Sequence, residues 1–148
     1  MTRSREELMT SVEESLERVF GPRSGRRHRP ADLELTLGQL DCLHAISRLG
    51  APSMSDLSRE LGLQPSSLTG IIDKLVAAGK VERRDDPADR RVVRVVLTAQ
   101  GRRDRDRHRR HRRRRLRKLL ASLDDAELGD LHRALATLAE AAERASPQ

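Results

Sequence analysis

Apolar residues recur every three or four positions in several segments of the chain, which is the spacing of amphipathic helices. These stripes predict helices over residues 4–20, 36–49, 53–61 and 65–79 and a further helix from residue 124 onward. Four of these helices begin at a serine, threonine or aspartate that can exchange hydrogen bonds with the residue three positions later. The predicted cap pairs are Ser4 with Glu7, Thr36 with Gln39, Ser53 with Asp56, and Asp124 with Glu127.

Two shorter segments have the β-branched composition and the alternation of β-strands. They cover residues 81–84 and 92–97, and the second places Val93, Val95 and Leu97 on one face. The loop between them holds one proline among aspartates and arginines, and it is longer than a tight hairpin requires. We therefore expect a β-hairpin whose loop projects from the body of the protein.

Positive charge is concentrated in residues 102–118. This segment has twelve basic and two acidic residues, a net charge of +10, whereas the whole chain of 148 residues carries +7. No residue from 102 to 115 is apolar, so periodicity cannot establish a helix there. Two interpretations stay open: the arginines contact the phosphates of a nucleic acid, or they form the solvated face of a linking helix.

Large apolar side chains are scarce, because the chain has one Phe and neither Tyr nor Trp. A lone monomer of this composition would bury little apolar surface, so we expect a homodimer that buries part of it between subunits. The apolar steps of three and four in the last predicted helix are those of a helix-packing seam. The expected dimerisation residues are Leu8, Val12, Leu16, Leu120, Leu128, Leu131, Leu135 and Leu138.

The order of elements predicts a winged helix-turn-helix. Two short helices joined by a four-residue link form the helix-turn-helix, and the hairpin that follows is the wing. The expected fold is mainly α with a small β-hairpin wing, divided into three parts. Residues 1–34 would form an N-terminal dimerisation helix and a basic loop, 35–99 the DNA-binding head, and 100–148 a long linking helix and a C-terminal dimerisation helix.

Such a head binds double-stranded DNA with the second helix, here 65–79, in the major groove. Short polar side chains on that helix allow close approach, and arginines at the wing tip, over 84–92, can enter the minor groove. Nearby carboxylates would orient these arginines. The candidate DNA-binding residues are Gln64, Pro65, Ser66, Ser67, Thr69, Gly70, Asp73, Lys74, Arg84, Asp89, Arg90 and Arg91.

The same residues resemble a known family. The segments "IIDKLVAAGKVERR", "DPADRR" and "LTAQG", in this order and at this spacing, are similar to those of the MarR family of bacterial transcriptional regulators. The resemblance implies a homodimer whose first and last helices interlock, with two winged helices that bind a pseudo-palindromic operator. It also implies that Arg91 is the minor-groove residue of the wing.

The resemblance further implies a repressor that responds to a small-molecule effector, bound beneath residues 35–50. Phe20 is the single aromatic residue, which argues against a pocket for phenolic ligands. An alternative function is non-specific, arginine-driven nucleic-acid binding by an architectural protein. An enzyme is not expected, because the chain has no glycine-rich phosphate loop, no paired carboxylates in an apolar setting and no nucleophile beside a base. No cofactor is expected.

The remaining reactive side chains favour structural roles. Cys42 lies between two leucines and follows an aspartate that would raise its pKa, so we expect an inert thiol. His108 and His111 have a spacing that could share a metal ion, but the arginines around them would repel it. His44 and His132 are expected to be half-exposed packing residues. With no signal sequence and no apolar run of ~20 residues, the protein is expected to be cytoplasmic, without a membrane segment.

Overall fold

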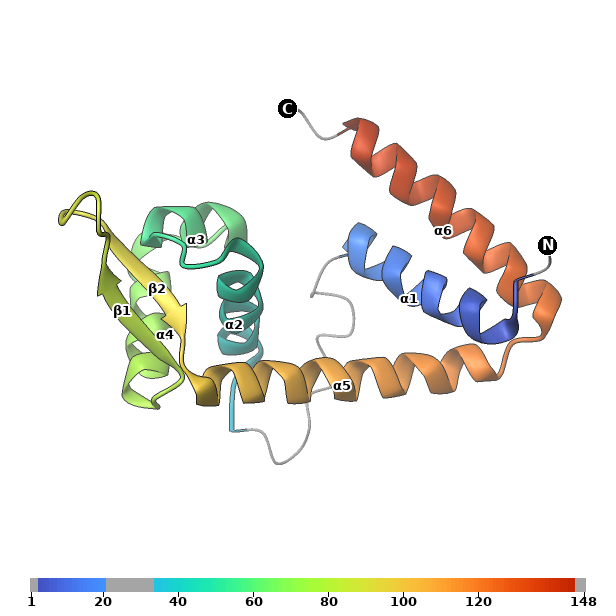
Figure 1. Cartoon of the computed structure of the whole chain (residues 1–148), viewed down its shortest axis with the longest axis horizontal. Coiled ribbons are helices and arrows are strands. Elements are labelled where there is room, and N and C mark those ends of the chain that lie inside the picture. The colour runs from blue at the N-terminus through green and yellow to red at the C-terminus, as the bar shows by residue number, and fades with distance from the viewer. Residues whose placement is uncertain (1–2, 21–33, 146–148) are drawn as a thin grey trace. The chain divides into compact units, whose positions relative to one another are not determined.

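The computed structural model describes residues 3–20 and 34–145, and the basic loop predicted after the first helix lies outside these residues. The described chain forms six helices and one two-stranded antiparallel hairpin (Figure 1), which confirms the mainly helical fold with a hairpin wing. Among these residues no helix has the length and apolar character that a membrane span needs. In chain order the elements are α1 (Arg5–Phe20), α2 (Leu37–Leu49), α3 (Met54–Leu61), α4 (Pro65–Ala77), β1 (Val81–Asp85), β2 (Val93–Leu97), α5 (Ala99–Ala121) and α6 (Asp125–Ala145).

The described chain divides into two compact units. We call residues 34–109 the head unit, which contains α2, α3, α4 and the β1–β2 hairpin. Residues 3–20 and 110–145 form the helical unit, which contains α1 and α6. Helix α5 is continuous and contributes its first residues to the head unit and the rest to the helical unit.

All four predicted cap pairs form. In each pair the cap side chain accepts a hydrogen bond from the backbone N–H three residues later, and that residue's side chain accepts one from the backbone N–H of the cap. The donor–acceptor distances lie between 2.7 and 3.2 Å. These bonds satisfy amides that would otherwise lack a partner in the first turn, so they fix where α1, α2, α3 and α6 begin.

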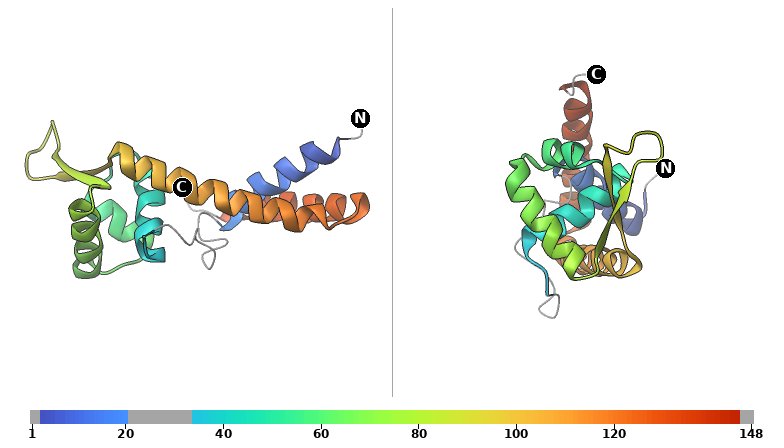
Figure 2. Two further views of the ribbon diagram at one scale, coloured as in Figure 1. Left: turned by 90° about the horizontal axis from the view of Figure 1, so that it is seen from below. Right: turned by 90° about the vertical axis from the view of Figure 1, so that its left-hand side faces the viewer.

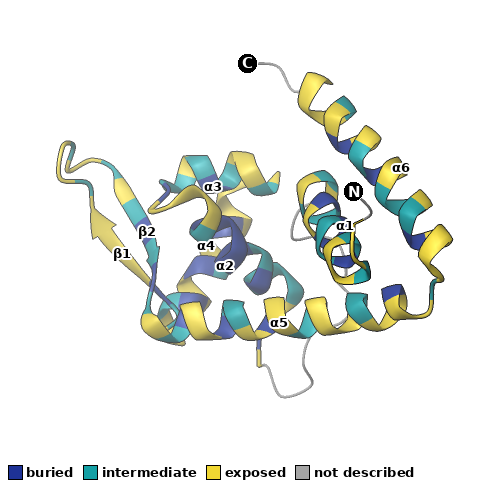
Figure 3. Cartoon of the chain, turned by 45° about the vertical axis from the view of Figure 1, so that its right-hand side comes forward, coloured by how far each residue is buried: buried dark blue, intermediate teal, exposed yellow. Residues whose placement is uncertain are grey.

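The core of the head unit lies where its three short helices face one another and the hairpin (Figure 3). Leucines and isoleucines with almost no exposed surface fill this space, as expected for a chain without large aromatic residues. The largest of these core side chains are Leu40, Leu43, Ile46, Leu57, Leu68, Ile72 and Leu75.

The hairpin pairs Val81 with Leu97 at its base and Asp85 with Val93 at its far end. Val95 and Leu97 are buried against the head helices, whereas Val93 is exposed although it lies on the same face. The difference follows from position, because the far end of the hairpin and its loop extend beyond the head helices (Figures 1 and 2). The projecting loop predicted from the sequence is therefore present.

Helix α5 starts in close contact with the base of the hairpin. The hydroxyl of Thr98 donates to the carbonyl oxygen of Gly79 at 2.6 Å and accepts from the backbone N–H of Gly101 at 3.1 Å. The ammonium group of Lys80 lies 2.5 Å from a carboxylate oxygen of Asp104, and both side chains are largely buried. This junction, formed by the sequence "LTAQG" and the turn before β1, ties the first turn of α5 to the base of the hairpin.

In the helical unit, α1 packs along α6. The buried apolar residues of the cluster around this contact are Met9 and Val12 of α1, Leu128 and Leu135 of α6, and Leu120 near the end of α5. A smaller polar contact closes one end, where the Arg5 guanidinium donates to the Asp125 carboxylate and to the Leu123 carbonyl. The first and last helices therefore bury their apolar stripes against each other within a single chain.

Candidate nucleic-acid interface

Helix α4 has one apolar side and one small polar side. Leu68, Ile72 and Leu75 are completely buried in the head core, which fixes the rotation of the helix about its axis. All the candidate DNA-binding residues in or next to this helix lie on the exposed side. They are Gln64, Pro65, Ser66, Ser67, Thr69, Gly70, Asp73 and Lys74.

A tight link sets the angle between α3 and α4. Gly62 ends α3 in the left-handed conformation, with φ of 63°, which a glycine adopts without strain. The Ser58 hydroxyl then donates to the carbonyl oxygen of Leu63 at 2.5 Å, and the Leu63 N–H donates back to the Ser58 carbonyl. The link is therefore held by hydrogen bonds in both directions, which gives α4 a defined position relative to α3.

Two residues on the exposed side of α4 already have partners within the head unit. The Thr69 hydroxyl donates to the Pro65 carbonyl at 2.8 Å, so its oxygen lone pairs face outward as acceptors. The Asp73 carboxylate accepts from the Arg83 guanidinium at 2.6 Å. This ion pair offsets the negative charge of Asp73 and ties β1 to α4.

The wing holds one arginine in a defined orientation. The Asp89 carboxylate accepts from the Arg91 backbone N–H at 3.0 Å and from the Arg91 Nε and guanidinium at 3.1 and 3.2 Å. These bonds, with that from the Arg91 side chain first among them, lower the pKa of Asp89 below its ordinary value of 3.8, so this carboxylate is charged at neutral pH. The Arg91 side chain is 90% exposed, and Arg90 beside it is exposed too. The predicted orientation of a wing arginine by Asp89 is therefore present.

Sequence reasoning missed three polar residues of the head unit: Arg83, Asp86 and Arg94. The side chain of Arg84, which was a candidate instead, pairs with Glu82 on its own strand. The Asp86–Pro87 dipeptide is a turn signal that could have identified Asp86. Nothing in the sequence indicates the partners of Arg83 and Arg94, because these lie ten and eight residues away on other elements.

The arginine-rich segment forms the middle of α5, and part of its charge is paired within the helical unit. Glu13 of α1 is almost completely buried, and its carboxylate accepts from Arg113 at 3.0 Å and from Arg117 at 2.7 Å. Arg112 likewise donates to Glu17 at 2.8 Å. Like charges four residues apart weaken an isolated helix, and these glutamates offset that repulsion. Arg110, Arg114 and Arg115 remain exposed.

The candidate dimerisation residues lie in the helical unit at graded depth. Val12, Leu120, Leu128 and Leu135 are buried by contacts within the chain. Other candidate residues are partly buried and pack against the same cluster. Leu138 is 44% exposed. The partly buried members are Leu8, Leu16 and Leu131. Within one chain these leucines thus already have an apolar core, and Leu138 lies outside it.

Comparison with known proteins agrees with this geometry. The family model described as "MarR family" matches residues 35–93. An HTH-type transcriptional regulator of Bacillus subtilis, YcgE, is 37% identical over 107 residues, which cover 70% of this chain and 68% of that protein. The chain belongs to the MarR family. It is therefore a helix-turn-helix transcriptional regulator that binds DNA, and not an enzyme.

Solved structures share the fold of this MarR-family chain. The crystal structure of RV1404 from Mycobacterium tuberculosis is 28% identical, with a TM-score of 0.67 over 90% of this chain and 84% of that one. A mutant of MarR from E. coli complexed with operator DNA is 24% identical, with a TM-score of 0.56 over 90% of this chain and 89% of that one. The second likeness shows the fold alone.

The single cysteine of this MarR-family chain is buried in the head core. Burial first, and the nearby Asp41 charge second, raise the pKa of the Cys42 thiol from 9.0 to about 12. Because the thiolate is the reactive form, a thiol with this raised pKa is expected to be inert at neutral pH.

We expect Cys42 to resist alkylation by iodoacetamide at pH 8 in the native protein and to react promptly in denaturant. Because the folded-state pKa is raised, the thiol's contribution to the free energy of unfolding is fully present below pH 9 and declines as the pH rises toward 12. Mass spectrometry of the alkylated peptide measures the rate. Rapid modification of the folded protein would show that the thiol is accessible.

His44 is more buried than its predicted half-exposed state, because α5 covers it. Its Nε2 lies 2.9 Å from Nδ1 of His108, and both rings are buried. His111, three residues further along α5, is not part of this pair. Among residues 3–20 and 34–145 no three histidine, cysteine or acidic side chains gather in a way that could hold a metal ion.

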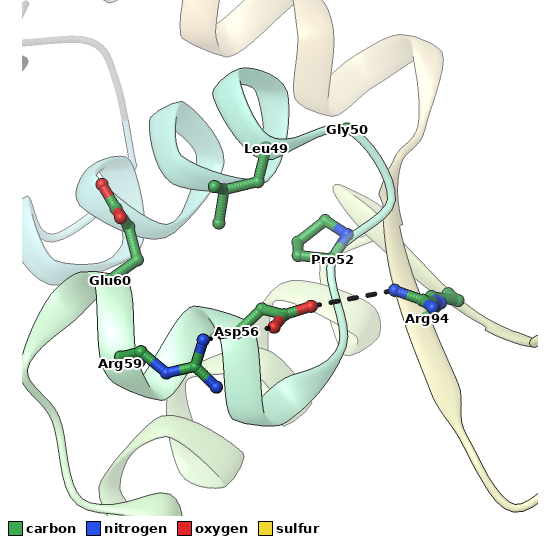
Figure 4. A pocket seen from close by; sticks show the side chains of 7 residues that line it. All are labelled: Leu49, Gly50, Pro52, Asp56, Arg59, Glu60 and Arg94. Carbon is green, nitrogen blue, oxygen red and sulfur yellow. Dashed lines mark ion pairs between the residues drawn. The ribbon is translucent and has the colours of Figure 1, made fainter. Parts of the chain in front are cut away.

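A small open pocket of about 210 Å³ lies between the end of α2 and the start of α3 (Figure 4). Three of its charged residues pair with one another, since Asp56 lies 3.7 Å from Arg94 and 3.9 Å from Arg59. Its other lining residues are Leu49, Gly50, Pro52 and Glu60. The pocket is mixed in charge and contains no aromatic residue, consistent with the argument against phenolic ligands.

Proposed function

We propose that this protein is a sequence-specific regulator that binds a pseudo-palindromic operator as a homodimer, and that it represses transcription until a small-molecule effector releases it. Each subunit would insert α4 into a major groove and the wing, residues 84–92, into the adjacent minor groove. The observation that carries the proposal is the Asp89–Arg91 pair, which presents an exposed guanidinium in a fixed orientation at the tip of a projecting loop. Such groups are favoured in narrow minor grooves.

The sites proposed for DNA contact are the exposed residues of α4 and the wing arginines. Homodimer formation would use the exposed apolar residues of the helical unit, where Leu119 is 66% and Leu138 is 44% exposed. Dimer symmetry would place two half-sites about one helical turn, or roughly 10 base pairs, apart.

Non-specific binding through the arginine-rich segment is the second candidate function, and the exposed Arg110, Arg114 and Arg115 favour it. The pairing of Arg112, Arg113 and Arg117 with glutamates weakens it, because those three charges are already neutralised within the chain. Fluorescence anisotropy with labelled DNA separates the two functions. The proposed function predicts that the DNA upstream of the protein's own gene, or another genomic operator, is preferred by ~10³-fold over scrambled DNA at about 150 mM salt. Equal affinity for all sequences, with steep loss as salt rises, would support the second.

We expect Arg91→Ala to weaken operator binding by about tenfold, which corresponds to about 1.4 kcal/mol. The physical reason is the loss of an exposed guanidinium that would enter the minor groove in the proposed complex. The same anisotropy titration measures the change. Arg48→Ala is the matched control, because Arg48 pairs with Glu60 between α2 and α3, outside both α4 and the wing. An affinity unchanged by Arg91→Ala would remove the wing from the interface.

A further inference from the structure

Arg94 lies where three parts of the head unit meet. Its backbone belongs to β2 and pairs with Arg84 of β1 and, through an isolated bridge, with Ser53 at the start of α3. Its Nε donates to the Asp86 carboxylate in the wing loop at 2.7 Å. Its guanidinium also lies 3.7 Å from the carboxylate of Asp56 in α3 (Figure 4). One side chain thus connects the wing loop with the first helix of the helix-turn-helix.

Asp86 holds the backbone of the wing loop through hydrogen bonds to its own side chain. One carboxylate oxygen accepts from the backbone N–H groups of Ala88 at 2.7 Å and Asp89 at 3.1 Å, while the other accepts from Arg94. The Asp86 side chain is only 13% exposed. The hydrogen bond from Arg94 is the main cause of its lowered pKa, so the carboxylate remains charged at neutral pH. The next carboxylate along the loop, Asp89, is the one that orients Arg91.

Asp56 provides the fixed end of this arrangement. Its carboxylate accepts from the Ser53 backbone N–H in the capping box of α3, so it cannot move without disturbing the start of that helix. A second backbone bond, from the Val95 N–H to the Pro52 carbonyl at 2.9 Å, holds β2 against the same segment. The connection therefore runs from the start of α3 through Arg94 and Asp86 to Asp89 and Arg91.

We propose that Arg94 is a positioning residue for DNA recognition: by joining Asp56 to Asp86 it fixes the wing loop relative to the helix-turn-helix, so that Arg91 meets the minor groove while α4 occupies the major groove. This inference rests on the proposed function. An arginine suits the role because its planar fork can serve two carboxylates at once, which a lysine cannot do with the same geometry. Without Arg94 the wing loop would be freer in the unbound protein. Ordering the loop on binding would then cost conformational entropy and lower the affinity for DNA.

The first test uses the free protein and needs no DNA. In Arg94→Met, amide hydrogen exchange at Ala88 and Asp89, measured by NMR, is expected to accelerate at least about tenfold, while amides of α2 and α4 keep their rates. Arg59→Met is the matched control, since Arg59 also pairs with Asp56 but does not touch the wing. Asp86→Asn is a second variant that keeps both backbone contacts and loses the charge pair. Unchanged exchange in both variants would overturn the inference.

The second test is a double-mutant cycle on operator DNA. Arg94→Met alone is expected to weaken binding about tenfold, but less than about twofold when Arg91→Ala is already present, because Arg94 acts through Arg91. Arg94→Lys should recover part of the loss. Equal losses in both backgrounds would show that Arg94 contacts DNA itself or only stabilises the fold, and would overturn the inference. If instead Arg91→Ala alone leaves the affinity unchanged, it is the proposed minor-groove function that fails, and the positioning role fails with it.

Discussion

Gly101→Ala is expected to destabilise the head unit by about 3 kcal/mol or more and to lower its melting temperature by at least about 10 °C. A Cβ at this position would lie 2.0 Å from the carbonyl oxygen of Lys80 and 3.0 Å from the carbonyl carbon. Backbone atoms cannot turn aside as a side chain would, so either α5 or the turn before β1 must shift. That shift would also strain the Thr98–Gly79 and Lys80–Asp104 contacts of the junction.

Thermal unfolding followed by far-ultraviolet circular dichroism measures this effect, since the chain has no Trp or Tyr to report it by fluorescence. Gly38→Ala is the matched control in the same unit. Its added Cβ would lie 3.8 Å from the Ile71 side chain, an ordinary contact, so the better helix propensity of alanine should stabilise α2 slightly, by about 0.5 kcal/mol. Equal melting temperatures for Gly101→Ala and the parent protein would show that the junction is looser than the structure indicates.

Leu135→Lys is expected to unfold the helical unit, with a loss of about 4 kcal/mol or more. Leu135 is 7% exposed and packs in the cluster that joins α6 to α1. The substitution removes a buried apolar side chain and places an ammonium group where the cluster offers no carboxylate. Circular dichroism should show lost helix, and limited proteolysis should cut in α1 and α6 while the head unit resists.

Leu138→Lys, three residues further along the same helix, separates folding from dimer formation. Because Leu138 is 44% exposed, a lysine there should leave the helical content and the melting temperature of a single chain nearly unchanged. If the exposed apolar residues of α6 form the proposed dimer interface, sedimentation should show monomers, and affinity for a two-half-site operator should fall by at least tenfold. Dimers that persist at micromolar concentration would place the interface elsewhere. Substituting Leu131 and Leu135 together would confuse the two effects, because Leu135 belongs to the fold itself.

The paired arginines of α5 show that part of the basic segment has a structural role. Glu6 and then Glu13 raise the pKa of Arg117, and Glu13 serves two arginines from a nearly buried position. The high arginine content is therefore partly a structural feature that joins α5 to the acidic side of α1. Neutralising Arg110, Arg114 and Arg115 to glutamine, while leaving the paired arginines intact, is the way to test the DNA contribution of the segment without disturbing the fold.

Local chemistry explains how much could be predicted from the sequence. Each cap pair involves residues three positions apart, so its formation depends on short-range geometry and is visible in the printed chain. The order of helix, turn, helix and hairpin is local in the same sense, and so is the orientation of Arg91 by Asp89, two residues before it. The sequence by itself therefore determined where α1, α2, α3 and α6 begin, the winged helix-turn-helix order, and the exposed polar side of α4.

Tertiary packing decided the remaining features, because they join residues that are far apart in the chain. The pairing of Asp73 on α4 with Arg83 on β1 is one such feature. The burial of His44 depends on α5, sixty-four residues away. The arrangement of α1, α5 and α6 gives Glu13 its two arginines and separates Leu135 from Leu138. Periodicity marks which side of a helix is apolar, but only the packed structure shows which neighbour covers that side and where the cover ends.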